Sequence, residues 1–294
     1  MKQDKTIGML VLGYVALSFF VFTMFSKISA LFMVPEIMTQ AYIDQWPFYK
    51  LNDLIIQQPS SSIISLILAI VTVALGFHYL LSKKTRFSYW LGVNFIFWGL
   101  GALFAGISYQ AFGYALKCVD LPRCTFTNWV ELLYMTLTVI SINVILMAYA
   151  SLIRDYNKAV FLKRLALLSI GAYTIFQGIG MLIPVQFMIS YEGMLLFLSP
   201  NIVIFIMLSY RLRTEKLHHH LLILWLTFIG INLAYFVALF ADIGALVLNS
   251  TRLWFNENDT LHVLLIIWML AWWIMIPPHA YKQQPVDVSI NDKK

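Results

Sequence analysis

The chain has 294 residues and a formal net charge of +6; 61% of its residues are apolar and only 12% are charged. Soluble domains carry roughly 25% charged residues, so this composition excludes a disordered chain and an ordinary soluble globule. The basic residues stand in short segments between apolar runs, which gives no reason to expect a nucleic-acid partner. We therefore predict an all-α integral membrane protein, with residues 1–294 forming one polytopic domain.

Eight uncharged apolar runs are each long enough to cross the hydrocarbon core, which takes roughly 20 helical residues. The runs are continuously apolar rather than alternating, which favours helices over barrel strands. The first run follows Lys2 and Lys5 but is too long for the apolar part of a signal peptide, so we expect it to be retained. The predicted spans are approximately 6–26, 61–82, 88–116, 129–153, 161–185, 193–212, 220–248 and 260–278, with an outer interfacial segment over 28–60.

The lysines and arginines indicate the orientation of these spans. With the N-terminus inside, fifteen of the 20 basic residues fall on inner segments and five on outer ones. Basic residues are enriched in cytoplasmic loops, so eight helices with both termini cytoplasmic are predicted. The expected location is a bacterial inner membrane or its equivalent, with membrane lipids as partners.

The two cysteines, Cys118 and Cys124, share one loop on the predicted outer side, where oxidation is permitted. Their spacing is compatible with a small disulfide and equally with two free thiols. It matches neither a redox Cys-x-x-Cys motif nor a zinc motif.

Ionisable residues at membrane depth are costly and usually face the interior of a bundle. The segment 254–262 opens the last predicted span and carries the most such chemistry. Asn258 and His262 are four residues apart on one helical face, and Asp259 is three residues from the same histidine. A carboxylate beside a histidine suits general-base or metal chemistry, with His262 and Asp259 as catalytic or metal-binding candidates. The alternative is that Asn256, Asn258 or Asp259 caps the helix.

Three further polar residues lie on the predicted outer side of the bundle. Gln110 closes the third span below a face of small residues, and either bonds across the bundle or lines a pocket. Asp53 precedes the second span. Asp242 lies about two turns from the end of the seventh and needs either a proton or a partner. With Asn258, these three are the candidate ligand-binding residues.

Three stretches share a pattern with known proteins: 51–53 (LND), 100–112 (LGALFAGISYQAF) and 255–262 (FNENDTLH). Together they resemble a family of polytopic membrane proteins that is similar to the CREST superfamily, which includes alkaline ceramidases and progestin/adipoQ receptors. In the enzymes, a seven-helix core binds zinc through one histidine on its second helix and a His-x-x-x-His pair on its last. Zinc-bound water then hydrolyses a lipid amide. The resemblance implies that spans two to eight form this core and that the first span is an addition.

The match of the zinc ligands is partial. The position of the second-helix histidine holds Gln110, and the pair is replaced by Asn258 and His262. Catalytic zinc normally takes three protein ligands, so Asp259 or Asp242 would have to complete the set around His262.

Three functions remain open from the sequence. The first is non-catalytic binding of a lipid or small ligand, or an accessory role, at an outer-facing polar pocket. The second is a zinc-assisted hydrolase of lipid amides or esters that uses Asp259 and His262. The third is a proton-coupled transporter that uses Asp242 and His262.

Overall fold

A computed structural model describes residues 37–44, 47–52, 54–82, 85–183, 185–251 and 254–277. The predicted first span at 6–26 and the candidate residue Asp53 lie outside these described residues. Within them, seven helices are long and apolar enough to cross a membrane. They are α3 (Pro59–Ser82), α4 (Arg86–Ala105), α6 (Trp129–Leu152), α7 (Tyr156–Leu182), α8 (Tyr191–Arg211), α9 (Lys216–Phe240) and α11 (Glu257–Met275).

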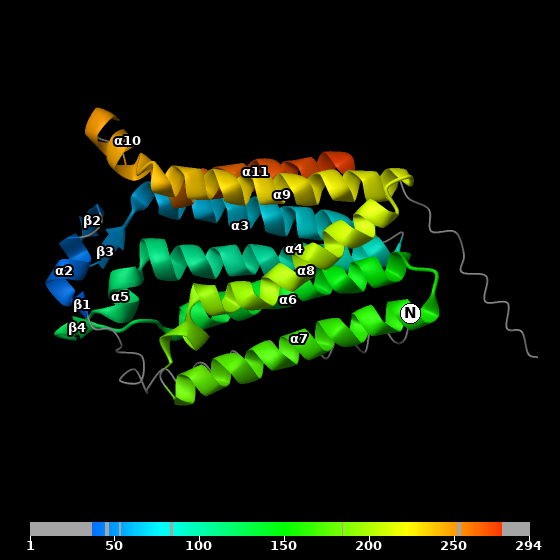
Figure 1. Cartoon of the computed structure of the whole chain (residues 1–294). Coiled ribbons are helices and arrows are strands. Elements are labelled where there is room, and N and C mark those ends of the chain that lie inside the picture. The colour runs from blue at the N-terminus through cyan, green and yellow to red at the C-terminus, as the bar shows by residue number, and fades with distance from the viewer. Residues whose placement is uncertain are drawn as a thin grey trace, which may run out of the picture.

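The seven helices run alternately up and down the long axis of the molecule (Figure 1). The helices α3, α6, α8 and α11 begin at the end that carries the strands and short helices, here called the capped end. Consecutive helices are joined by short connections at the opposite end, such as the turn between α8 and α9. The protein is therefore a multi-pass helical bundle of the kind that the sequence predicts.

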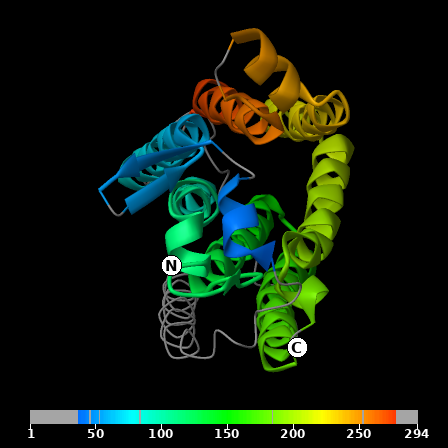
Figure 2. The ribbon, with the colours of Figure 1, turned by 90° about the vertical axis from the view of Figure 1, so that its left-hand side faces the viewer.

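Six of the helices form a closed ring, seen from the capped end in Figure 2. Neighbouring pairs pack in the order α3, α4, α6, α8, α9, α11 and back to α3. Helix α7 packs mainly on the outside of α6, and α6 is accordingly the most deeply buried of the seven. Along its length, α6 also carries polar groups that bond to neighbouring helices, such as Asn143, whose Oδ1 accepts from Asn201 Nδ2 of α8 at 3.2 Å.

Aromatic side chains pack the ring away from the capped end. The ring of Trp225 stacks on Phe205 with centroids 4.7 Å apart and contacts Trp268 and Trp272 of α11. The indole nitrogens find partners, because Trp225 Nε1 donates to Tyr149 Oη at 2.9 Å and Trp268 Nε1 donates to a carbonyl of α9 at 2.8 Å. Large aromatic rings close this part of the bundle, and the indole nitrogens of Trp225 and Trp268 are hydrogen-bonded.

Short elements cover the capped end. The strands β1 (Ile37–Met38) and β4 (Arg123–Cys124) pair, and β2 (Phe48–Leu51) pairs with β3 (Leu54–Gln57), all antiparallel. The helices α2 (Thr39–Asp44) and α5 (Gly113–Lys117) lie beside them (Figure 1). The described part of the predicted interfacial segment 28–60 thus contains a short helix, a hairpin and the start of α3, and these strands are a small departure from an all-α fold.

Two span boundaries differ from the sequence prediction. The run 88–116 divides into α4, a π-helix η2 (Gly106–Ala111) and α5. The run 220–248 divides into α9 and a separate helix α10 (Ile243–Thr251). Asp242 stands in the turn between them with a φ of 48° and is exposed. Its Oδ1 accepts from the Ala245 N–H at 3.4 Å, so this aspartate caps α10.

Candidate polar site at the capped end

The last spanning helix begins with a pair of reciprocal hydrogen bonds. Asn256 Oδ1 accepts from the Asp259 N–H at 3.1 Å, and Asp259 Oδ2 accepts from the Asn256 N–H at 3.0 Å. This capping box satisfies two backbone donors that the first turn of α11 would otherwise leave unpaired. Both side chains are buried. Asp259 therefore has the capping role that was one of its two interpretations, and one of its carboxylate oxygens is already committed.

Helices α3 and α11 run in parallel and lie in register over their whole length. At the capped end, Ser60 Oγ donates to the Trp254 carbonyl at 2.7 Å, and at the other end Tyr79 Oη donates to the Ile276 carbonyl at 2.5 Å. One residue after Ser60, the Ser61 side chain lies near the Asp259 carboxylate, and Ser61 Oγ and Asp259 Oδ1 have no hydrogen-bond partner among the described residues. In each of these contacts, the residue at α11 stands about 194 to 198 positions after its partner in α3. The nearly constant separation means that the two helices keep one register.

This register sets the depth of the candidate histidine. Ser65 is one turn below Ser61 on the same face of α3, and His262 is three residues below Asp259 on α11. These steps correspond to rises of about 6 Å and about 4.5 Å along the two helices. His262 and Ser65 therefore lie at about the same depth. The Nδ1 atom of His262 is buried and has no hydrogen-bond partner in the described part of the chain.

Gln110 reaches the same level from the other side of α3. It lies on η2, where a π-helical turn replaces the α-helical one, and such turns occur often at functional sites. Helix α3 packs against η2 so closely that a Cβ at Gly106 would collide with Ser65 Oγ. The same Cβ position is 3.7 Å from Gln110 Oε1, so the Gln110 amide lies close to Ser65. Gln110 Oε1 is buried, and no described residue donates a hydrogen bond to it.

The two serines Ser61 and Ser65, called the serine face, thus connect α11 with η2. The sequence predicts these two segments on the same side of the membrane, and the structure places α3 between them. Gln110 and Asp259 lie near this face, His262 is at the depth of Ser65, and Asn258 is half-buried in the first turn of α11. Asp242 does not lie near the serine face, because it is in the exposed turn before α10.

A buried ion pair lies at the same end, on the side of α6. Lys117 Nζ is 2.5 Å from Glu131 Oε1 and donates to the Phe126 carbonyl at 3.1 Å. Thr127 Oγ1 donates to the other carboxylate oxygen of Glu131 at 2.8 Å. The Lys117 ammonium also stands 5.1 Å from the centre of the Tyr109 ring, within range of a cation–π interaction. The ion pair and these hydrogen bonds offset part of the cost of burying the Glu131 carboxylate.

The cap is joined to this ion pair. Cys118, next to Lys117, forms a disulfide with Cys124 of β4, and both cysteines are buried. Tyr42 of α2 lies within electrostatic range of Glu131, and this charge, together with burial, raises the pKa of the Tyr42 hydroxyl. Gln57 Oε1 accepts from the Tyr114 N–H at 2.9 Å, which ties the hairpin to α5.

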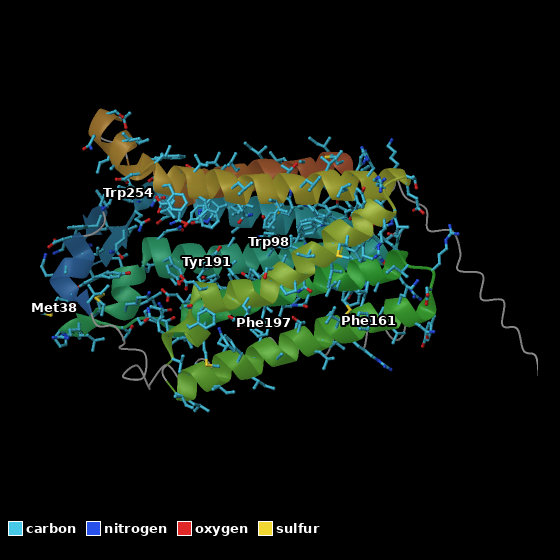
Figure 3. All side chains as sticks on the ribbon, in the orientation of Figure 1. Met38, Trp98, Phe161, Tyr191, Phe197 and Trp254 are labelled. Carbon is cyan, nitrogen blue, oxygen red and sulfur yellow. A yellow bond between two sulfur atoms is a disulfide. The ribbon has the colours of Figure 1, made fainter. Side chains whose placement is uncertain are left out.

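Four tyrosines from four elements meet at the capped end of the ring, and this set is called the tyrosine group. The rings of Tyr109 and Tyr134 pack edge to face with their centroids 5.6 Å apart. The Tyr134 hydroxyl lies within electrostatic range of Tyr191, and Tyr191 within range of Tyr235. In Figure 3, Tyr191 lies at the start of α8, between the layer of α6 and the layer of α9 and α11.

The tyrosine group, the serine face and the ion pair were not identified from the sequence. Ser61 and Ser65 carried a usable signal, because two serines four residues apart mark one face of an otherwise apolar helix. The tyrosines carried none, since single tyrosines near the ends of spans are typical of the membrane interface.

The zinc ligand set that the resemblance implies is not assembled here. No three His, Cys, Asp or Glu side chains come together at metal-binding distance in the described part of the chain. Asp259 is engaged in the capping box, and Asp242 is in an exposed turn. Because the residues around His262 do not fit three-ligand zinc, no catalytic step through a metal is derived.

Comparison of the chain with protein-family models, with curated proteins and with solved structures finds no match. The resemblance to the CREST superfamily therefore stays a prediction from the residues that carry it.

Proposed function

We propose that this protein is a polytopic integral membrane protein that binds a small molecule or a lipid head group at its capped end, without catalysing a reaction. The observation that carries this proposal is the Oε1 atom of Gln110. It is an amide oxygen in a side chain that is 6% exposed, on a π-helical turn, with no partner among the residues that the structure describes. A buried acceptor without a donor costs about 1–3 kcal/mol, and an exogenous ligand that supplies the donor offsets this cost.

The surroundings of Gln110 support a binding role. The serine face, Asp259 and His262 add hydrogen-bonding groups at the same depth, and His262 Nδ1 also lacks a partner. These two atoms are among several buried polar atoms that have no partner in the described residues, and Ser61 Oγ and Asp259 Oδ1 are two more at this end of the bundle. The aromatic core closes the ring below this level, so a ligand would enter from the capped end.

We propose further that the capped end faces outward, with eight spans and both termini cytoplasmic, in a bacterial inner membrane or its equivalent. The basic residues support this orientation, because those that flank the ends of the spans gather at the opposite end of the bundle. They are Arg86, Arg154, Lys158, Arg211, Arg213 and Lys216. Such residues stay on the cytoplasmic side of a membrane.

The two alternatives receive less support from this geometry. A zinc-assisted lipid hydrolase requires two more ligands for His262, and none of the described residues supplies them in a suitable position. A proton-coupled transporter relied on Asp242 at membrane depth, whereas Asp242 caps α10. Neither alternative explains why Gln110 is buried without a partner.

The test is ligand recovery from the purified full chain. Wild type, Gln110→Leu and Gln186→Leu are extracted with organic solvent, and the bound lipids and small molecules are quantified by mass spectrometry. Gln186 is a matched control, because it is an exposed glutamine near the same end. We expect one species to be enriched on wild type and on Gln186→Leu and to be lost on Gln110→Leu. Equal recovery from all three proteins would contradict the proposal.

A further inference from the structure

The end of the bundle opposite the cap carries a surplus of positive charge. Over the whole chain, fifteen of the 20 basic residues but only five of the 14 acidic residues belong to the segments that the sequence predicts on this side. These five acids are Asp4, Asp155, Glu215, Asp287 and Asp292. The surplus follows from these counts, so it remains even where one basic side chain pairs with an acid.

Two connections between helices bring part of this charge to one corner of the bundle, at the end away from the strands (Figure 1). Arg154 lies in the connection between α6 and α7, and Lys158 lies in the first turn of α7. Helix α8 ends at Arg211, Arg213 follows in the turn, and Lys216 begins α9. All five side chains are exposed, and together they are called the basic corner.

Buried hydrogen bonds join the helix ends that carry the basic corner. Tyr149 Oη, near the end of α6, is 2.6 Å from Ser209 Oγ, near the end of α8. The same Tyr149 oxygen accepts from Trp225 Nε1 of α9 at 2.9 Å. Tyr149 and Ser209 are 1% and 0% exposed. The five basic side chains are therefore held on helix ends that are packed and bonded to one another, rather than on independent loops.

The acidic side chains beside the corner cannot balance its charge. Asp155 caps α7, because its Oδ1 accepts from the N–H groups of Asn157 and Lys158 at 2.9 and 3.2 Å, and its Oδ2 is 3.4 Å from Lys158 Nζ. Glu215 Oε2 is 3.9 Å from His218 Nε2. Within the described residues, these two carboxylates stand beside the five basic side chains of the corner.

Exposed tyrosines indicate that the corner lies at the level of the lipid head groups. Tyr156 is 75% exposed and Tyr210 is 55% exposed, and tyrosines at the ends of spans are typical of the membrane interface. The guanidinium of Arg213 is 4.0 Å from the centre of the Tyr210 ring and donates to the Tyr210 carbonyl at 2.9 Å. An arginine stacked in this way keeps further N–H donors for a phosphate.

We infer that the basic corner binds the head group of an anionic phospholipid, and this inference is independent of the site around Gln110. Arginine and lysine side chains recognise phosphate oxygens through charge-assisted hydrogen bonds, and anionic lipids attract basic residues at the ends of spans. The position of the corner, with Tyr156 and Tyr210 beside it, favours a lipid over a soluble phosphate.

The test uses the purified full chain in a neutral detergent at constant ionic strength, with the midpoint of thermal unfolding as readout. The probes are phosphatidylglycerol, phosphatidylcholine with matched acyl chains, and inorganic phosphate. Phosphatidylcholine carries the same phosphate together with a cation that cancels its charge. We expect a rise in midpoint with phosphatidylglycerol alone. Equal shifts with the two lipids, an equal shift with inorganic phosphate, or no shift with any probe would overturn the inference.

Two lysines provide a matched pair of variants. Lys216→Gln at the basic corner and Lys50→Gln on the cap each remove one exposed positive charge and change the net charge equally. Lys216→Gln should weaken the apparent affinity for phosphatidylglycerol about fivefold, the usual contribution of one basic residue near anionic lipid. Lys50→Gln should leave this affinity unchanged. Equal losses in the two variants, or no loss in Lys216→Gln, would show that the lipid does not bind at the basic corner.

Discussion

Lys117 and Glu131 form an ion pair of 2.5 Å in which the side chains are 8% and 1% exposed. One residue precedes the disulfide loop and the other lies in the first turn of α6, so the pair joins the cap to the most deeply buried helix of the bundle. An ion pair removed from water in this way is balanced only while both partners are present.

Removing one partner of this pair is expected to be costly. Glu131→Leu leaves the Lys117 ammonium without its counter-charge, and the loss of unfolding free energy should be about 3–5 kcal/mol. The double variant Lys117→Met/Glu131→Leu should recover much of this loss, because it removes both charges. Denaturant unfolding of the two variants and wild type measures the difference. A double variant less stable than Glu131→Leu would show that the pair does not behave as a compensated unit.

Gln110→Leu should make the ligand-free protein more stable, which is unusual for a change in the interior. The substitution removes a buried amide oxygen that has no donor in the protein, and such groups cost about 1–3 kcal/mol. The measurement is the unfolding free energy after delipidation. As a contrast, Gln177→Leu should be destabilising, because Gln177 bonds to Thr136 and Tyr173. A loss of stability in both variants would mean that Gln110 is satisfied within the protein.

The start of α11 offers a test of the capping role of Asn256. Asn256→Ala removes the acceptor for the Asp259 N–H and should lower the unfolding free energy by about 1 kcal/mol. Asn258→Ala, two residues later, removes no capping bond shown by the structure and should have a smaller effect. If the larger loss came from Asn258→Ala, the role of Asn258 in the site would have to be reconsidered.

The disulfide should resist reduction in the folded protein. Cys118 and Cys124 are 1% and 2% exposed, so a soluble reductant has no direct access to them. Thiol labelling followed by mass spectrometry should detect no free cysteine until denaturant is added. The double variant Cys118→Ser/Cys124→Ser should lose about 2 kcal/mol of unfolding free energy, as expected for a short closed loop. Rapid labelling of the native protein would show that the cap opens readily.

The zinc content of the purified protein tests the hydrolase alternative. We expect purified wild type to hold much less than one zinc per chain, since His262 has no pair of metal-ligating neighbours among the described residues. The measurement is elemental analysis after growth in zinc-supplemented medium, with His262→Ala as the control. One zinc per chain that is lost in His262→Ala would favour the hydrolase.

The general architecture could be predicted from the sequence because it depends on continuous apolar runs, and hydropathy measures these directly. The seven long helices match the predicted spans in number over the described residues. The end of the seventh span could not be placed, because 220–248 reads as one apolar run. The break at Asp242 depends on a turn with positive φ and on a cap for the next helix.

Less of the candidate site than of the fold could be predicted from the sequence. Gln110, Asp259 and His262 stood out because polar residues are rare at membrane depth. Their relation to one another depends on the register of α3 against α11 and on the π-helical turn at η2, and single residues encode neither of these. The partners that matter most, Ser61 and Ser65, are residues common on any helix.

The most direct measurement is an experimental density map of the full chain, purified with its native lipids, around the Gln110 amide. We predict non-protein density about 3 Å from Gln110 Oε1, a normal hydrogen-bond distance, on the side of the serine face and His262. A map in which Gln110 Oε1 accepts a hydrogen bond from a group of the protein itself, with no other density nearby, would contradict the existence of the binding site.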